Sequence, residues 1–162
     1  MRKLLKKIEF ALLTFWYFII GPTGTPETPD VENLKIPPIP YGLLKKGKWT
    51  KNEIFISLYL KVYGIETLGF SYKYIVQCLG RSEAAMDRKL HRLQDLWDKQ
   101  PCEDHEYSRL DEEIFGSFKI LSPRRAELEF LKRMSEVTIP RAPEVSAYFL
   151  MRYEGSLNSI LY

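Results

Sequence analysis

The side chains that could perform catalysis or bind a metal are few and scattered in this chain. The two histidines are His91 and His105, and the two cysteines are Cys78 and Cys102. They form no Cys-x-x-Cys or Cys/His cluster, which a zinc site would require. The acidic run 103–113 lacks the spacing and the glycine of a calcium loop, and no phosphate-cradling glycine loop or G-x-S-x-G turn is present. We therefore expect no enzyme activity, no cofactor and no metal site, and the unpaired thiols favour a reducing compartment.

Basic side chains, by contrast, are concentrated in one part of the chain. The net charge is only +3, yet residues 45–100 hold eleven basic and six acidic residues, whereas residues 101–113 hold one and six. The stretch LGRSEAAMDRKLHRL lies inside the basic part. Arginine and histidine side chains on an exposed helix face can reach base edges or phosphates. The pattern therefore predicts a nucleic-acid contact, and the alternative is an ordinary solvated helix face.

Three helices are expected to position these basic side chains. The T-x-x-E sequence from Thr50 to Glu53 is a capping box and predicts a helix over 51–63, ended by Gly64. Four apolar residues recur at intervals of three and four and are expected to form its buried stripe: Phe55, Leu58, Tyr59 and Val62.

The second and third helices are predicted from their caps and from the turn between them. Ser71 precedes a helix over 72–79, and Ser82 precedes a helix over 83–99. Gly80 ends the first of the two, and a short glycine turn between helices indicates a helix-turn-helix. The expected core of the second helix is Ile75, Val76 and Leu79. That of the third is Met86, Leu90, Leu93 and Trp97.

This three-helix segment resembles a Myb/SANT-type helix-turn-helix domain over about residues 46–97. The residues that carry the resemblance are Trp49, Glu53, Tyr72, Ile75-Val76, Leu79-Gly80-Arg81-Ser82, Ala85-Met86, Lys89-Leu90 and Leu93. The resemblance implies that the third helix is the recognition element, usually in the DNA major groove. The family also has members that bind histone tails or other proteins, so DNA does not follow from the fold alone.

The expected DNA-contacting residues combine the third helix with the lysines before the first. They are Lys45, Lys46, Lys48, Lys51, Arg81, Ala84, Arg88, His91 and Arg92. The lysines could form a flexible arm on the DNA backbone or a solubilising flank. Arg81 could contact a phosphate or cap the carboxyl end of helix 72–79. Asp87 and Asp95 argue against DNA, because each repels phosphate.

The chain before residue 45 divides into an apolar helix over residues 1–21 and a proline-rich linker over 22–44. The apolar run Phe10–Ile20 is short for a transmembrane helix. It is expected to pack on the protein or a partner, to associate with a membrane, or to serve as a targeting sequence. The linker is expected to lie on the surface through Ile36, Ile39 and Tyr41.

The chain after residue 100 is expected to begin with an acidic loop and an extended segment over 101–121, with a short strand or extended stretch over 115–121. A helical extension over 122–162 follows, with helices over 123–135 and 143–154. Gly155 is the expected stop of the last helix.

The sequence as a whole predicts an all-α protein with a helix-turn-helix domain over 45–100. The function expected is binding of double-stranded DNA in transcription or chromatin, in the nucleus of a eukaryote or otherwise in the cytoplasm. The alternative is a structural or adaptor subunit of a larger assembly that binds protein partners through the same three-helix unit and the apolar N-terminal helix. Self-association through the N- and C-terminal helices and membrane contact through Phe10–Ile20 are further expectations.

Overall fold

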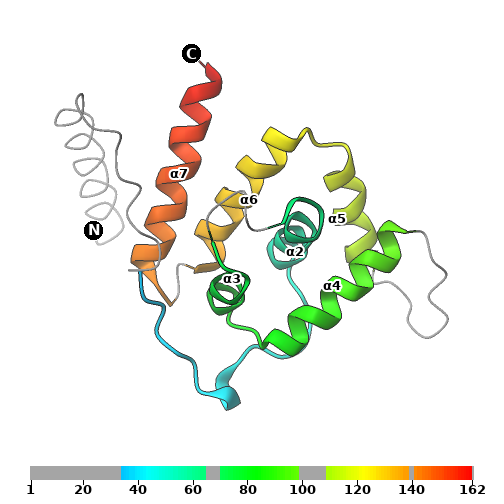
Figure 1. Cartoon of the computed structure of the whole chain (residues 1–162), viewed down its shortest axis with the longest axis vertical. Coiled ribbons are helices and arrows are strands. Elements are labelled where there is room, and N and C mark those ends of the chain that lie inside the picture. Colours follow the sequence, from blue (N-terminus) through cyan, green and yellow to red (C-terminus); the bar gives the residue numbers. More distant parts are fainter. Residues whose placement is uncertain (1–33, 65–69, 99–108, 139–140, 162) are drawn as a thin grey trace. The chain divides into compact units, whose positions relative to one another are not determined.

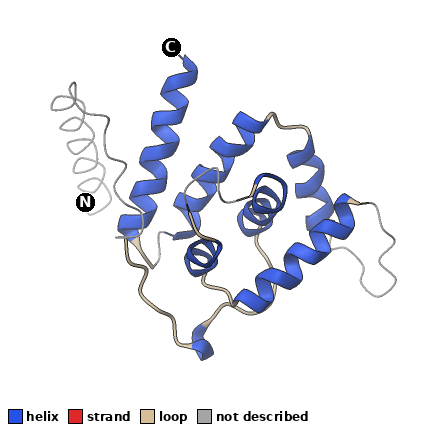
Figure 2. Cartoon of the chain, viewed as in Figure 1, coloured by secondary structure: helices blue, strands red, loops and turns tan. Residues whose placement is uncertain are grey.

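The computed structural model describes residues 34–64, 70–98, 109–138 and 141–161, and every regular element in these ranges is helical (Figures 1 and 2). The elements are the 3-10 helix η2 (Tyr41–Leu43) and the α-helices α2 (Lys51–Tyr63), α3 (Tyr72–Leu79), α4 (Glu83–Trp97), α5 (Arg109–Lys119), α6 (Pro123–Thr138) and α7 (Pro143–Leu161). The expected all-α class is therefore confirmed for the described residues. The expected helix over 1–21, the run Phe10–Ile20, and residues Cys102 and His105 lie outside them.

Helix α2 occupies the centre of the bundle and packs against α4, α5 and α6. Its capping box is formed as expected, with Thr50 accepting from the Glu53 amide and the Glu53 side chain reaching back to the cap. Eight consecutive residues, 53–60, are buried, so α2 is enclosed on all faces rather than along one stripe. The expectation for Val62 was wrong, since it is 37% exposed near the end of the helix, beyond this enclosed section.

Helices α3 and α4 have the expected limits and caps to within two residues. Ser71 and Ser82 accept hydrogen bonds from the amides of Tyr74 and Ala85. Gly80 adopts φ +70°, a left-handed conformation that ends α3 and that a side chain would strain.

The core face of α4 differs from the expectation. Met86 and Leu93 are fully buried, but Leu90 is half-buried and Trp97 is 43% exposed. Lys89 takes the buried position because α5 supplies an acid to pair with it. Trp97 instead packs at the rim against the ring of Phe115.

Helix α5 replaces the strand or extended stretch expected over 115–121. Asp111, Ile114 and Phe118 share one buried face at helical spacing. Asp111 and Glu112 lie in the first turn, where their negative charges stabilise the helix because its amino end carries a partial positive charge. Residues 109–113 of the expected acidic loop are therefore the first turns of this helix.

Helices α6 and α7 form the closest helix pair, and both run past their expected ends. Helix α6 reaches Thr138 instead of residue 135, and α7 passes through Gly155 to Leu161. Gly155 has none of the positive φ that marks Gly47, Gly64 and Gly80. A helical glycine costs only about 1 kcal/mol relative to alanine, so α7 continues through it.

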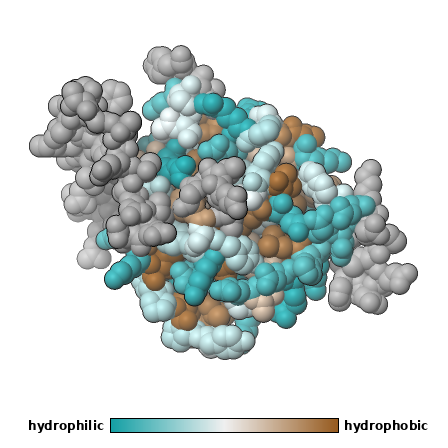
Figure 3. Space-filling view, viewed as in Figure 1, coloured by the Kyte–Doolittle hydropathy of each residue, from teal (hydrophilic) through white to brown (hydrophobic). Residues whose placement is uncertain are grey.

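The proline-rich segment before α2 lies along α3 and the turn that follows. Ile36 and Ile39 are half-buried, as expected, but Tyr41 is 79% exposed. The Tyr74 hydroxyl donates to the Leu34 carbonyl oxygen, and Arg141 donates to that of Pro37. In the space-filling view, apolar and polar surfaces alternate over the described residues (Figure 3).

Candidate nucleic-acid interface

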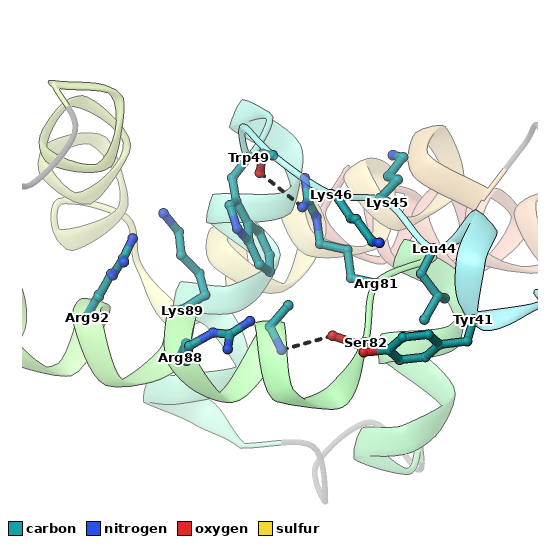
Figure 4. A pocket seen from close by; sticks show the side chains of 12 residues that line it. Tyr41, Leu44, Lys45, Lys46, Trp49, Arg81, Ser82, Arg88, Lys89 and Arg92 are labelled. Atoms are coloured by element: carbon teal, nitrogen blue, oxygen red, sulfur yellow. Dashed lines mark hydrogen bonds between the residues drawn. The ribbon is translucent and has the colours of Figure 1, made fainter.

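A groove of about 290 Å³ lies between residues 41–49 and the exposed side of α4 (Figure 4). Six of its lining residues are basic: Lys45, Lys46, Arg81, Arg88, Lys89 and Arg92. None of its lining residues is acidic. The groove therefore brings together five residues that were expected to contact DNA, from two segments about forty residues apart in the chain.

The segment 44–49 that forms one wall of the groove is fixed to the turn between α3 and α4. The Lys45 amide donates to the Gly80 carbonyl oxygen over 2.8 Å. Arg81 donates from Nη1 to the Gly47 carbonyl oxygen over 3.2 Å and from Nη2 to that of Lys48 over 2.8 Å. These bonds place the lysines beside α4, and the flexible arm expected from the sequence is a docked segment.

Arg81 is buried and holds the segment before α2 in place, an arrangement that differs from both roles expected for it. Its guanidinium is buried, pairs with the Glu53 carboxylate and lies 4.2 Å from the centre of the Trp49 ring. Gly80 caps α3 through its own amide. Arg141 bonds the Gln77 carbonyl oxygen over 2.6 Å. A phosphate could not displace Arg81 without leaving Glu53 buried and unpaired.

The ionisation of Glu53 depends on this network. Burial raises the pKa of the Glu53 carboxyl, but the hydrogen bond and charge of Arg81 outweigh it, with help from Lys45 and Thr50. The pKa of Glu53 is therefore lowered below its ordinary value. A charged Glu53 holds Arg81 in place, and Arg81 in turn holds the wall of the groove.

Two further cations of the groove already have partners. Lys89 is buried and its Nζ lies 2.5 Å from Asp111 Oδ1 on α5, which ties α4 to α5. Lys45 Nζ lies 3.8 Å from Glu53 Oε1, with half of its side chain exposed. Lys89 is thus unavailable to a ligand, whereas Lys45 can turn towards one.

The remaining three cations, Lys46, Arg88 and Arg92, are exposed and have no acidic partner among the residues that the structure describes. All three side chains line the same groove (Figure 4). Like charges gathered without counter-charges repel one another, and a bound anion would relieve that repulsion.

The other expected contact residues lie outside the groove. Ala84 and His91 are exposed on α4, and Lys48 is exposed but contributes only its carbonyl oxygen, to Arg81. Lys51 lies on α2 with its Nζ 3.0 Å from Glu113 Oε1. Among these, Ala84 and His91 share the exposed side of α4 with Arg88.

Two aromatic residues line the groove that were not expected as binding residues. Trp49 is half-buried under Arg81 and forms part of the lining, and Tyr41 extends along the opening beside Ser82 (Figure 4). Tyr41 follows Pro40 at the end of the proline-rich stretch, and an exposed aromatic residue directly after prolines was the available signal. Aromatic faces can stack on bases or sugars.

Acidic residues also lie on the exposed side of α4. Asp87 accepts a hydrogen bond of 2.7 Å from the Tyr72 hydroxyl. Burial and the Asp87 carboxylate raise the pKa of Tyr72, so that hydroxyl stays a donor. Glu83 is exposed in the first turn. The carboxylates of Glu83 and Asp87 would repel phosphate, so α4 does not attract phosphate along its whole exposed side.

The groove beside α4 gathers basic side chains and has no carboxylate in its lining. Within them, no three His, Cys, Asp or Glu side chains gather as a metal site, and no helix is long and apolar enough to cross a membrane. Comparison of the chain with protein-family models, with curated proteins and with solved structures gives no significant match.

Proposed function

We propose that this protein binds double-stranded DNA in transcription or chromatin, with the groove beside α4 on the phosphate backbone. The observation that carries the proposal is one groove with three exposed cations that have no acidic partner among the described residues: Lys46, Arg88 and Arg92. Phosphate contacts of this kind supply most of the affinity of non-specific DNA binding.

We further propose that α2, α3 and α4 act as a Myb/SANT-like helix-turn-helix, with α4 as the recognition helix. Support comes from the left-handed Gly80 turn and the Ser82 cap, which join α3 and α4 as such a unit requires. Ala84 and His91 are exposed on α4, where they would meet base edges while Lys46, Arg88 and Arg92 hold phosphates.

The test is a salt titration of the full chain on a fluorescein-labelled duplex, read by fluorescence anisotropy. Each phosphate contact contributes about 0.9 to the slope of log affinity against log salt. The triple variant Lys46→Ala, Arg88→Ala, Arg92→Ala removes three such contacts, so its slope should be shallower by about 2.7.

A matched control removes the same charge from other surfaces. Lys61, Lys73 and Lys132 are exposed on α2, α3 and α6 and do not line the groove. Their triple alanine variant should keep nearly the slope of the parent protein. Affinity that is absent, or equal losses in the two triple variants, would contradict the proposed interface.

The alternative function is that of an adaptor subunit that binds proteins through the same helices and through residues 1–21. Glu83 and Asp87 favour it, because they lie exposed on α4 where DNA would bring phosphates. Pull-down with and without residues 1–21 separates the two functions. An adaptor should lose partners on deletion, whereas DNA binding through the groove should persist.

A further inference from the structure

A second groove, of about 740 Å³, lies between the α5–α6 turn and the last turns of α7. Figure 1 shows the α5–α6 turn and the last turns of α7 at the same end of the bundle, away from the turn between α3 and α4. Its apolar lining residues are Phe55, Ile120, Leu121, Leu128 and Leu157. Phe55 and Leu128 are buried and form the floor, whereas Ile120 is 79% exposed and Leu157 36% exposed.

Arginines line the same groove. Arg124 and Arg125 are exposed in the first turn of α6 and have no acidic partner among the described residues. Arg124 donates only to the Ser159 hydroxyl, over 2.6 Å. The amino end of α6 adds its own partial positive charge at this place. Arg133 also lines the groove, and its Nε is buried without a hydrogen-bond partner among the described residues.

The acid in the lining does not neutralise these cations. Glu129 lies 3.5 Å from Arg133 Nε, at the i,i+4 spacing along α6. Arg133 also lies over the Phe55 ring and donates to the Asn52 side chain over 2.8 Å. One carboxylate therefore faces three guanidinium groups, and the groove has both an apolar surface and a net positive charge.

We propose that this groove docks an acidic amphipathic segment of a partner protein. Aliphatic side chains of the segment would cover Ile120 and Leu157, and its carboxylates would pair with Arg124 and Arg125. The proposal is independent of DNA binding, because none of these residues lines the groove beside α4.

Charge complementarity favours this occupant over two segments of the chain itself. The apolar run Phe10–Ile20 follows the basic sequence MRKLLKK, which would meet the arginines with like charge. The acidic residues 101–113 of a second copy hold Leu110 as their one aliphatic side chain. Neither combines several aliphatic residues with carboxylates, as the groove requires.

The experiment is a selection of 16-residue peptides from a random display library on the full-length protein, followed by anisotropy with a labelled synthetic peptide. Enriched peptides should combine Asp or Glu with Leu, Ile or Phe. Two variants, Ile120→Ser and Arg124→Glu with Arg125→Glu, should each weaken the peptide at least about tenfold, as central interface residues do. Because Ile120 and both arginines are exposed, the variants should keep the far-UV circular dichroism of the parent.

Matched controls are Leu43→Ser, an exposed leucine outside the groove, and Lys132→Glu, an exposed cation elsewhere on α6. Both should leave the peptide affinity within about twofold. No enrichment, enrichment of basic peptides, or equal binding by the groove variants would overturn the proposal. So would displacement of the peptide by duplex DNA. Self-association that Arg124→Glu with Arg125→Glu abolishes would overturn it in favour of a second copy.

Discussion

Replacing Arg81 by methionine should destabilise the protein strongly, although Arg81 looks like a surface DNA contact in the sequence. Methionine keeps an apolar stem of similar reach but donates no hydrogen bond. The change removes the pair with Glu53, the bonds to the carbonyl oxygens of Gly47 and Lys48, and the contact with the Trp49 ring.

The magnitude follows from what remains around Glu53. Its side chain is 0% exposed, and without Arg81 it keeps only the cap contact with Thr50 and Lys45 at 3.8 Å. Breaking a buried pair by removing one partner costs about 3–5 kcal/mol, because the other charge stays buried. Since whole domains are stable by about 5–15 kcal/mol, this loss is a large share of the total.

The assay is urea denaturation followed by far-UV circular dichroism, on Arg81→Met, Glu53→Gln and the double variant. Glutamine can still complete a capping box, so Glu53→Gln removes the charge and keeps the cap. The double variant should be more stable than Arg81→Met alone by about 2 kcal/mol, because no uncompensated charge is left buried.

Arg88→Met is the matched control, since Arg88 lines the same groove with an exposed side chain. It should change the free energy of unfolding by less than about 0.5 kcal/mol while weakening DNA binding. A loss below about 1 kcal/mol in Arg81→Met, or a double variant no more stable than it, would refute the positioning role of Arg81.

Three further predictions follow from single contacts. Asp87→Asn removes a charge that opposes phosphate, so duplex DNA should bind about two- to fivefold more tightly by anisotropy at low salt; weaker binding would place DNA elsewhere. The lowered pKa of Glu53 means that its stabilisation is present above the ordinary value of 4.5 and is lost as pH falls through the folded value. The difference in urea midpoint between the parent and Glu53→Gln should therefore shrink below pH 4.5, and a constant difference would count against the ion pair. Burial raises the pKa of Cys78 to about 12, so alkylation at pH 8, mapped by peptide mass spectrometry, should modify Cys78 only in denaturant.

Local sequence signals were sufficient for the helix limits in the centre of the chain. The capping residues Thr50, Ser71 and Ser82 and the glycine stop Gly80 act on the backbone within four residues of themselves. Such signals do not depend on the rest of the fold, so α2, α3 and α4 were predicted to within two residues.

Burial was predicted less well, because it depends on which elements come to lie beside a helix. A stripe pattern cannot reveal that α2 is enclosed by three helices, or that Lys89 is buried because α5 brings Asp111 to it. The helix α5 itself was missed, since its buried face takes shape only against α2. Gly155 was read as a stop, but a glycine stops a helix only where the chain adopts positive φ.

In the candidate site, too, some features are predicted from the sequence and others depend on the packing of the helices. By itself, the sequence determined the basic excess of residues 45–100 and the helix that carries Arg88 and Arg92, because composition and short-range spacing suffice for both. Only the tertiary structure decided which cations are free. Glu53 neutralises Arg81 and Asp111 neutralises Lys89 across 28 and 22 residues. Lys46 is brought beside α4, and no acid of the described residues pairs with it. Ion pairs depend on distance in space, and that distance is fixed only when the helices pack.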